Sequence, residues 1–155
     1  MEFSKSLQEY SFERVNQETI NSLVDLELEL WPDNERESLL RDTFVLLDNS
    51  DNNIFLVCRK SNQNVGFIHV SLRHDYVEGA DFSPTGFIEG IYVEESFRGI
   101  GIARKLVECG EVWCREKGCR QLASDIELNN KGSFDFHNSI GFEETNRIIC
   151  FLKNI

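Results

Sequence analysis

The residues best suited to chemistry lie in one stretch just past the middle of the 155-residue chain. Glu89 stands within an apolar run, residues 87–93, whose aromatic and β-branched side chains predict a strand covered on both faces. A carboxylate in such surroundings is desolvated, which favours its protonated form and raises its affinity for protons. We expect Glu89 to accept a proton from an ammonium-bearing substrate, directly or through a water. The alternative is a structural carboxylate paired with an arginine.

A turn with two glycines follows this run and opens a helix. Gly99 and Gly101 have no β-carbon, so their backbone can approach a phosphate closely and successive N–H groups can point at it. Arg98, Arg104 and Lys105 crowd the first turn of the helix, where the partial positive charge of the helix end favours acidic residues. A bound anion would resolve this conflict. The alternative is an ordinary tight turn with solvated cations.

Two familiar phosphate-binding motifs do not fit this turn. The chain has no Gly-x-x-x-x-Gly-Lys-Ser/Thr run, which a P-loop needs. A dinucleotide fold needs Gly-x-Gly-x-x-Gly in the first strand–helix unit, whereas this unit lies past the middle and has Arg104 at the third position. What remains is Arg98-x-x-Gly101-x-Ala103 after a buried strand.

Three further side chains are candidates for the same site. Asp125 ends the next predicted strand, and ligands of open α/β sheets gather beyond the carboxyl ends of strands, so Glu89, Val93 and Asp125 are expected to face one crevice. The alternative for Asp125 is a turn cap. Trp31 and Tyr76 lie in predicted loops, where they could stack on a sugar or cover a cation, or close the core instead.

The elements that position these residues follow from hydrophobic periodicity. Helices are expected over residues 18–30 and 35–47, from Ile102 to an end at Lys117 and Gly118, and from the loop 129–133 to about Ile140. Strands are expected over residues 10–16, 54–59, 65–73, 87–93, 121–125 and 147–153. The resulting fold class is α/β, with a mixed sheet in which the strands 87–93 and 121–125 form a parallel pair around the helix between them.

Composition limits the classes of function. One domain over residues 1–155 is expected, and the net charge of −11 repels nucleic acid and anionic membranes but attracts cations. No apolar run is long enough to span a membrane, and the start of the chain lacks a signal-peptide pattern, so a cytoplasmic protein is expected. Five cysteines without a Cys-x-x-Cys pair predict reduced thiols, and metal-ligand spacing is absent.

The motif of Arg98, Gly101 and Ala103 after a buried strand resembles the coenzyme A site of the Gcn5-related N-acetyltransferases. Over nearly the whole chain, short segments resemble one branch of that superfamily, the aminoglycoside 6′-N-acetyltransferases. These segments are Trp31-Pro32, Arg73-His74-Asp75-Tyr76-Val77, Ser83-Pro84, Glu89-Gly90-Ile91, Phe97-Arg98, Gly118-Cys119-Arg120, Ala123-Ser124-Asp125 and Gly141-Phe142-Glu143-Glu144-Thr145.

The resemblance implies acetyl-CoA as the donor, the 6′-amine of an aminoglycoside as the acceptor and direct attack by that amine. Backbone groups of Ile91, Tyr92 and Val93 would bind the pantetheine arm and polarise the thioester carbonyl. Asn130 would meet the coenzyme near its thiol end. The pyrophosphate would lie in the turn that Arg98 precedes, held by N–H groups of Gly99, Ile100, Gly101, Ile102, Ala103 and Arg104.

By the same resemblance, Trp31, Tyr76, Glu89 and Asp125 would line the aminoglycoside pocket. Glu89 would be the base or the anchor of a relaying water, with Asp125 the second choice. Family members also carry histidine and glutamate at the pocket positions of Asn34 and Asn146, so a carboxylate is lost at position 146.

Many members of the superfamily place a tyrosine, thought to protonate the leaving thiolate, where His137 stands. His137 could do this work, or it could be an i+4 partner of Ser133 on a helix. The missing tyrosine is the best argument for a rival function, a non-catalytic acyl-CoA-binding module. A second rival is an acetyltransferase for a polyamine or a protein N-terminus. The apolar last strand could pair or exchange with a second copy, so a homodimer is expected.

Overall fold

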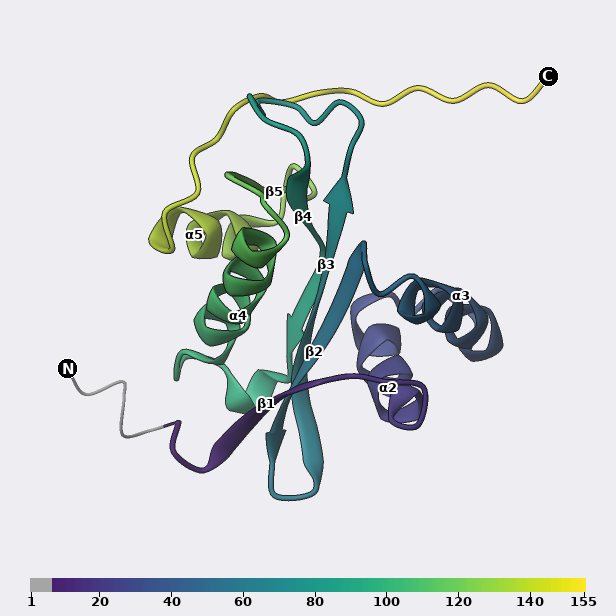
Figure 1. Cartoon of the computed structure of the whole chain (residues 1–155), viewed down its shortest axis with the longest axis vertical. Coiled ribbons are helices and arrows are strands. Elements are labelled where there is room, and N and C mark those ends of the chain that lie inside the picture. The colour runs from purple at the N-terminus through teal and green to yellow at the C-terminus, as the bar shows by residue number, and fades with distance from the viewer. Residues whose placement is uncertain (1–6) are drawn as a thin grey trace.

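The computed structural model describes residues 7–155, which form a five-stranded mixed sheet flanked by helices (Figure 1). The strands stand side by side in chain order; the first four run antiparallel to their neighbours, and the fifth is parallel to the fourth. In order the elements are β1 (Tyr10–Arg14), α2 (Ile20–Leu30), α3 (Arg36–Asp48), β2 (Asn53–Lys60), β3 (Gln63–Arg73), β4 (Thr85–Val93), the 3₁₀ turn η1 (Glu95–Phe97), α4 (Ile102–Glu116), β5 (Leu122–Ser124) and α5 (Lys131–Ser139).

Both faces of the central strands are covered, as their nearly unbroken apolar sequences predict. Figure 1 shows α4 on one side of the sheet and α2 with α3 on the other. Alternating residues serve the two sides: Leu56 and Ile68 belong to the core under α4, whereas Phe55 and Phe67 belong to the core under α2. The sheet therefore holds two hydrophobic cores, one on each face.

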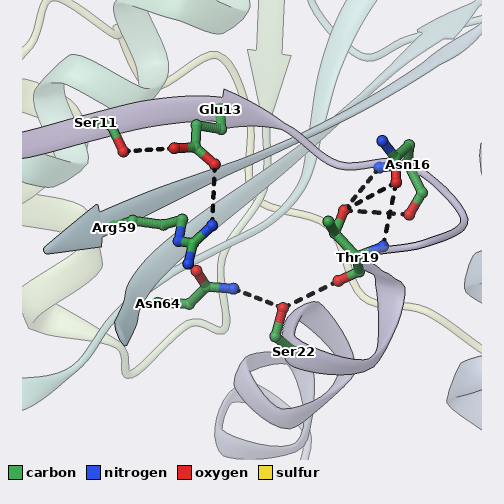
Figure 2. A network of polar contacts seen from close by, with 7 residues as sticks. All are labelled: Ser11, Glu13, Asn16, Thr19, Ser22, Arg59 and Asn64. Carbon is green, nitrogen blue, oxygen red and sulfur yellow. Dashed lines mark hydrogen bonds and ion pairs between the residues drawn. The ribbon is translucent and has the colours of Figure 1, made fainter. Parts of the chain in front are cut away.

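A polar network fixes the start of α2 against the sheet (Figure 2). The Asn16 side-chain oxygen accepts from the backbone N–H of Thr19 at 3.2 Å, while the Thr19 hydroxyl accepts from the N–H of Asn16 at 3.0 Å. One turn later, the Asn64 side chain on β3 donates to Ser22 Oγ at 2.8 Å. These bonds satisfy backbone groups at the helix end and set the direction in which α2 runs toward Trp31.

The observed elements confirm the predicted α/β class with its parallel pair, with boundaries that differ by a few residues. The predicted strand 147–153 is wrong. Within the described chain these residues pair with no strand, and Ile149, Phe151 and Leu152 are 82%, 91% and 96% exposed. Figure 1 shows the segment running past the β3–β4 loop and away from the sheet. An apolar, β-branched sequence favours a strand, but a strand also needs a neighbouring edge within reach.

The prediction that the start of the chain lacks a signal peptide concerns residues 1–5, which lie outside the described residues. Between residues 7 and 155, the structure has no helix that is both long and apolar enough to cross a membrane. The same residues contain no group of three or more His, Cys, Asp or Glu side chains that could hold a metal ion.

Candidate active site

The candidate site is centred on Glu89, where β4 changes its pairing with both neighbouring strands. Gly90 and Ile88 pair with consecutive residues of β3, so Glu89 is one extra residue, a β-bulge. On the opposite edge, parallel pairing with β5 ends where Ile88 meets Ser124. No strand of the described chain pairs with that edge of β4 beyond Ile88, so the backbone of residues 89–93 borders an opening between the two strands.

Two β3 side chains bind the Glu89 carboxylate. Ser71 Oγ donates to Oε1 at 2.5 Å, and Arg73 donates from Nε to Oε1 at 3.0 Å and from Nη2 to Oε2 at 2.9 Å. Burial by itself would raise the pKa of Glu89, but the hydrogen bonds from Arg73 and Ser71 and the charge of Arg73 together hold this pKa below its ordinary value. The predicted rise in proton affinity is therefore wrong, and Glu89 is an ionised, arginine-paired carboxylate.

The glycine turn after β4 has the backbone form that an anion site requires. Gly99 and Gly101 adopt φ angles of 81° and 97°, in the left-handed region that glycine enters without strain. Gly101 is the N-cap of α4, and no side chain of the described residues caps this helix. The first hydrogen bond of the helix runs from the Lys105 N–H to the Gly101 carbonyl at 3.0 Å, which leaves the preceding amides of the first turn without a helical acceptor. The turn thus fits a pyrophosphate.

Asp125 follows β5 directly, at the level where β4 continues into Glu89. It is exposed and lies one residue beyond β5, whereas the predicted strand 121–125 included it. Asn130 is the N-cap of α5, and its side-chain oxygen accepts from the Ser133 N–H at 3.1 Å, so its side-chain N–H groups remain as donors for a ligand.

His137 uses both of its ring nitrogens within the protein. Nδ1 lies 2.7 Å from the Ser133 carbonyl oxygen, and Nε2 lies 2.8 Å from Ser124 Oγ. Because a carbonyl oxygen can only accept, Nδ1 carries a proton, and in the neutral ring Nε2 accepts from the Ser124 hydroxyl. His137 thus ties α5 to the end of β5, and the geometry favours the structural interpretation.

Comparison with known proteins agrees with this geometry. The model of the acetyltransferase (GNAT) family matches residues 20–142. The chain belongs to the GNAT acetyltransferase family. It is 40% identical over 128 residues to an aminoglycoside N(6′)-acetyltransferase type 1 from Stenotrophomonas maltophilia, covering 83% of this chain and 82% of the relative. A protein of the same name from Salmonella typhimurium is 36% identical over 140 residues, 90% of this chain and 96% of the relative.

Solved structures extend the likeness to three dimensions. AAC(6′)-Iy in complex with the bisubstrate analogue CoA-S-monomethyl-acetylneamine superposes with a TM-score of 0.90 at 35% identity, over 94% of this chain and 99% of that one. AAC(6′)-Ih from Acinetobacter baumannii gives a TM-score of 0.88 at 32% identity, over 94% and 99% of the two chains. The structure therefore has the GNAT fold.

Of the remaining predicted site residues, Trp31 lies beside β4, whereas Tyr76 and Asn146 meet at Glu78. Trp31 ends α2 and lies directly against β4, since a β-carbon placed on Gly90 would meet its Cη2 atom at 2.6 Å. Tyr76 is 81% exposed on the β3–β4 loop and donates to Glu78 Oε2 at 2.7 Å. Asn146 donates to the other oxygen of Glu78 at 3.0 Å, so Tyr76 and Asn146 meet through one carboxylate.

Asn34 lies in the turn after α2, where its side chain approaches the Trp31 carbonyl at 3.4 Å. This contact keeps Asn34 beside Trp31 at the end of α2. Glu29 of α2, Tyr92 of β4, and Glu94, Glu95 and Ser96 line a shallow groove of about 560 Å³ on the same side of the sheet. Its three carboxylates make this approach to the site acidic.

Two of the cations predicted to lie near a bound anion, Arg98 and Arg104, make contacts within the protein. Arg98 Nε donates to the Val93 carbonyl at 2.7 Å, and its guanidinium lies 5.5 Å from the centre of the Tyr92 ring. Arg104 donates to the Ser139 carbonyl at 3.2 Å, which links α4 to the end of α5. These contacts within the protein hold the two arginines in part.

Sequence reasoning missed Ser71, Arg73 and Glu78 as partners of site residues. A signal for the first two is present: His69, Ser71 and Arg73 alternate with apolar residues along β3, which places them on one face of the strand. The register that aligns this face with Glu89 depends on the bulge, which the sequence pattern does not reveal. Glu78 joins its partners through a loop, whose path has no periodic signal.

Proposed function

We propose that this chain transfers the acetyl group of acetyl-CoA to the 6′-amine of aminoglycoside antibiotics. One observation carries the proposal: β4 parts from β5 at the Glu89 bulge, directly ahead of an uncapped glycine turn, in a chain that matches 94% of its length to AAC(6′)-Iy. That relative is in complex with an analogue joining CoA to an acetylated neamine. The net charge of −11 supports a polycationic acceptor.

The donor would bind along β4 and the following turn. Backbone groups of Ile91, Tyr92 and Val93 would hold the pantetheine arm and polarise the thioester carbonyl. Asn130 would donate from its free side-chain N–H groups near the thiol. The pyrophosphate would accept from the turn formed by Arg98, Gly99, Ile100, Gly101, Ile102, Ala103 and Arg104.

The acceptor would lie between the β4–β5 opening and the end of α2. Trp31 supplies an aromatic wall, and Glu89 and Asp125 supply two carboxylates for its ammonium groups. Tyr76, Asn34 and Asn146 would contact the more distant rings. Glu78 bridges Tyr76 and Asn146, so it restores a negative charge beside position 146.

The reaction would be a direct transfer. The neutral 6′-amine attacks the thioester carbonyl, a C–N bond forms, and the tetrahedral intermediate breaks its C–S bond to release the CoA thiolate. Because Glu89 is ionised, it would anchor the ammonium or the water that carries its proton away, and Asp125 is the second candidate for this role. The thiolate takes a proton from solvent, since His137 is engaged at both nitrogens.

The test is a thiol-release assay with neamine and with paromamine, its counterpart that has a hydroxyl in place of the 6′-amine. We expect release with neamine and none with paromamine. Equal release with both would move the reaction to another amine, and CoA binding without release over a panel of polyamines and peptides would make the chain a binding module.

We further infer that the chain forms a homodimer by exchanging residues 147–153. Thr145 packs against Gly79, where a β-carbon would meet its side chain at 2.6 Å, and Asn146 binds Glu78. Both contacts attach the segment to the β3–β4 loop and lead it away from the β5 edge of the same chain. Exposed, apolar and extended, it suits a partner's sheet edge.

The β5 edge offers a place for the partner's segment. A groove of about 600 Å³ runs beside it, with Cys114, Cys119, Leu122, Ala123 and Phe142 among its lining residues. Light scattering should give twice the chain mass, and both the deletion of 147–155 and the point variant Phe151→Lys should give the monomer mass. A monomer for the unaltered chain at all concentrations would contradict the exchange.

A further inference from the structure

We propose that Arg73 is a positioning residue for acetyl transfer. By binding both oxygens of Glu89 it holds this carboxylate in one orientation and in its ionised form, as the anchor for the acceptor's ammonium or for the water that takes its proton. The inference rests on the proposed function and assigns within it a role to a residue outside the predicted site.

The geometry of the pair is that of a fork. Arg73 Nε and Nη2 bind the two different oxygens of Glu89 at 3.0 and 2.9 Å, which fixes the plane of the carboxylate as well as its distance. Ser71 adds the third hydrogen bond to this carboxylate, from its Oγ to Oε1 at 2.5 Å. Three donors on one strand thus hold a side chain that projects from a bulge of the next strand, where the ladder is locally disrupted.

Arg73 is itself held in place. Its guanidinium carbon lies 3.4 Å from the centre of the Phe87 ring, so the group stacks on a buried aromatic face of β4. Phe87 in turn pairs with Ser71 across the two strands. A lysine at position 73 would keep the charge but lose both the fork and the flat stacking surface.

The neighbours of Glu89 make Arg73 its dominant cation. On β3, His69 also faces Glu89, but burial lowers the pKa of His69 to about 4, so it is neutral at physiological pH. From α2, Trp31 packs on the adjacent Gly90 and is uncharged, and the Glu27 carboxyl is turned toward Thr43 of α3. Asp125 follows β5, next to the Ser124 that pairs with Ile88 of β4. Without Arg73, the largest remaining influence on Glu89 is desolvation, which raises its pKa.

Two variants separate orientation from charge. Arg73→Lys keeps a cation, so we expect kcat to fall about tenfold while the acidic limb of the kcat/KM profile stays in place. Arg73→Gln removes the cation, so we expect a fall of about 10- to 100-fold and an acidic limb displaced to higher pH. The KM for acetyl-CoA should stay near the wild-type value in both, because the glycine turn is untouched.

Arg59→Gln is the matched control. Arg59 is also a β-strand arginine that pairs across the sheet, with Glu13 of β1 at 3.3 Å (Figure 2). This pair joins the first two strands of the sheet, whereas Arg73 and Glu89 join the third and fourth. The Arg59→Gln variant should have a lower melting temperature and an unchanged pH profile of kcat/KM. An Arg73→Gln enzyme with wild-type kcat, or with an unmoved acidic limb, overturns the inference. A wild-type protein that acetylates no aminoglycoside would instead overturn the proposed function.

Discussion

The indole of Trp31 covers the backbone of Gly90, the residue that follows the bulged Glu89. A β-carbon on Gly90 would lie 2.6 Å from Trp31 Cη2 and 2.9 Å from Cζ2, closer than real β-carbons come to their neighbours. Trp31 also packs edge-on against Phe67, at 6.2 Å between ring centres. The end of α2 is thereby fixed against the strand that carries the site, so a residue without a side chain sets the position of an aromatic wall.

Gly90→Ala should therefore damage the acceptor side of the site. The added methyl group forces Trp31 outward, at a cost in folding free energy of about 1–3 kcal/mol. We expect the KM for the aminoglycoside to rise about tenfold, while CoA affinity measured by calorimetry stays unchanged. Trp31→Phe in the same background relieves the overlap, so it should restore part of the lost stability. A Gly90→Ala enzyme with wild-type KM would show that Trp31 does not border the acceptor.

A second prediction concerns stability rather than activity. Burial raises the pKa of Glu27 to about 7 from an ordinary value of 4.5, with the Thr43 hydroxyl opposing the shift. The folded state thus binds a proton that the unfolded state has released between these two values, so stability falls as pH rises through this window, by up to about 3 kcal/mol.

Glu27→Gln keeps the shape and the hydrogen bond to Thr43 but cannot ionise. Urea unfolding should show little difference from wild type near pH 4.5 and a gain for the variant of about 2–3 kcal/mol above pH 7. Glu37→Gln, an exposed change on α3, is the control and should leave the pH dependence intact. Parallel stability curves for wild type and Glu27→Gln would mean that Glu27 stays ionised.

The fold could largely be predicted from the sequence because burial on both faces leaves apolar runs, such as residues 54–58, between clear turn signals. The position of Glu89 in a strand and of Gly99 and Gly101 in a turn was also legible. The charge state of Glu89 was not, because Arg73 lies sixteen positions away on another strand and meets it through an irregular register. The prediction of a strand at residues 147–153 was wrong for a related reason. These residues have the composition of a strand, but strand formation depends on a neighbouring edge that the local sequence does not describe.

A third prediction follows from the cysteines. Burial raises the pKa of both Cys58 and Cys114 to about 12 and also raises that of Cys109 and Cys119, so these thiols stay protonated at neutral pH and are poor nucleophiles. The protein incubated with acetyl-CoA alone should keep its mass. Cys150→Ala, which removes the exposed thiol, should retain turnover and a ternary-complex rate law. A stable acetyl-enzyme in the mass spectrum would contradict direct transfer.

His137 gives a fourth prediction. Since its ring joins the Ser133 carbonyl to the Ser124 hydroxyl, His137→Ala should lower the free energy of unfolding by about 1–2 kcal/mol. At a temperature where the variant is folded, we expect kcat within a few-fold of wild type and an unchanged basic limb of its pH profile. Ser124→Ala removes one of the two contacts and should lose less stability. A folded variant with a displaced basic limb would instead make His137 the acid that protonates the thiolate.

A fifth prediction compares two glycines at which alanine causes similar backbone strain, so that any difference between the variants comes from ligand binding. Gly99 and Gly118 have φ angles of 81° and 85°, and within the described residues nothing lies within 4 Å of a β-carbon added to either. Alanine at each position should therefore cost a similar folding free energy, about 1–2 kcal/mol, from the left-handed conformation alone.

Gly99 precedes α4, where the pyrophosphate would bind, whereas Gly118 follows the other end of the same helix. Calorimetry should show CoA affinity about tenfold weaker for Gly99→Ala and unchanged for Gly118→Ala. Equal affinities would place the pyrophosphate away from this turn, and equal losses would trace the effect to α4 as a whole.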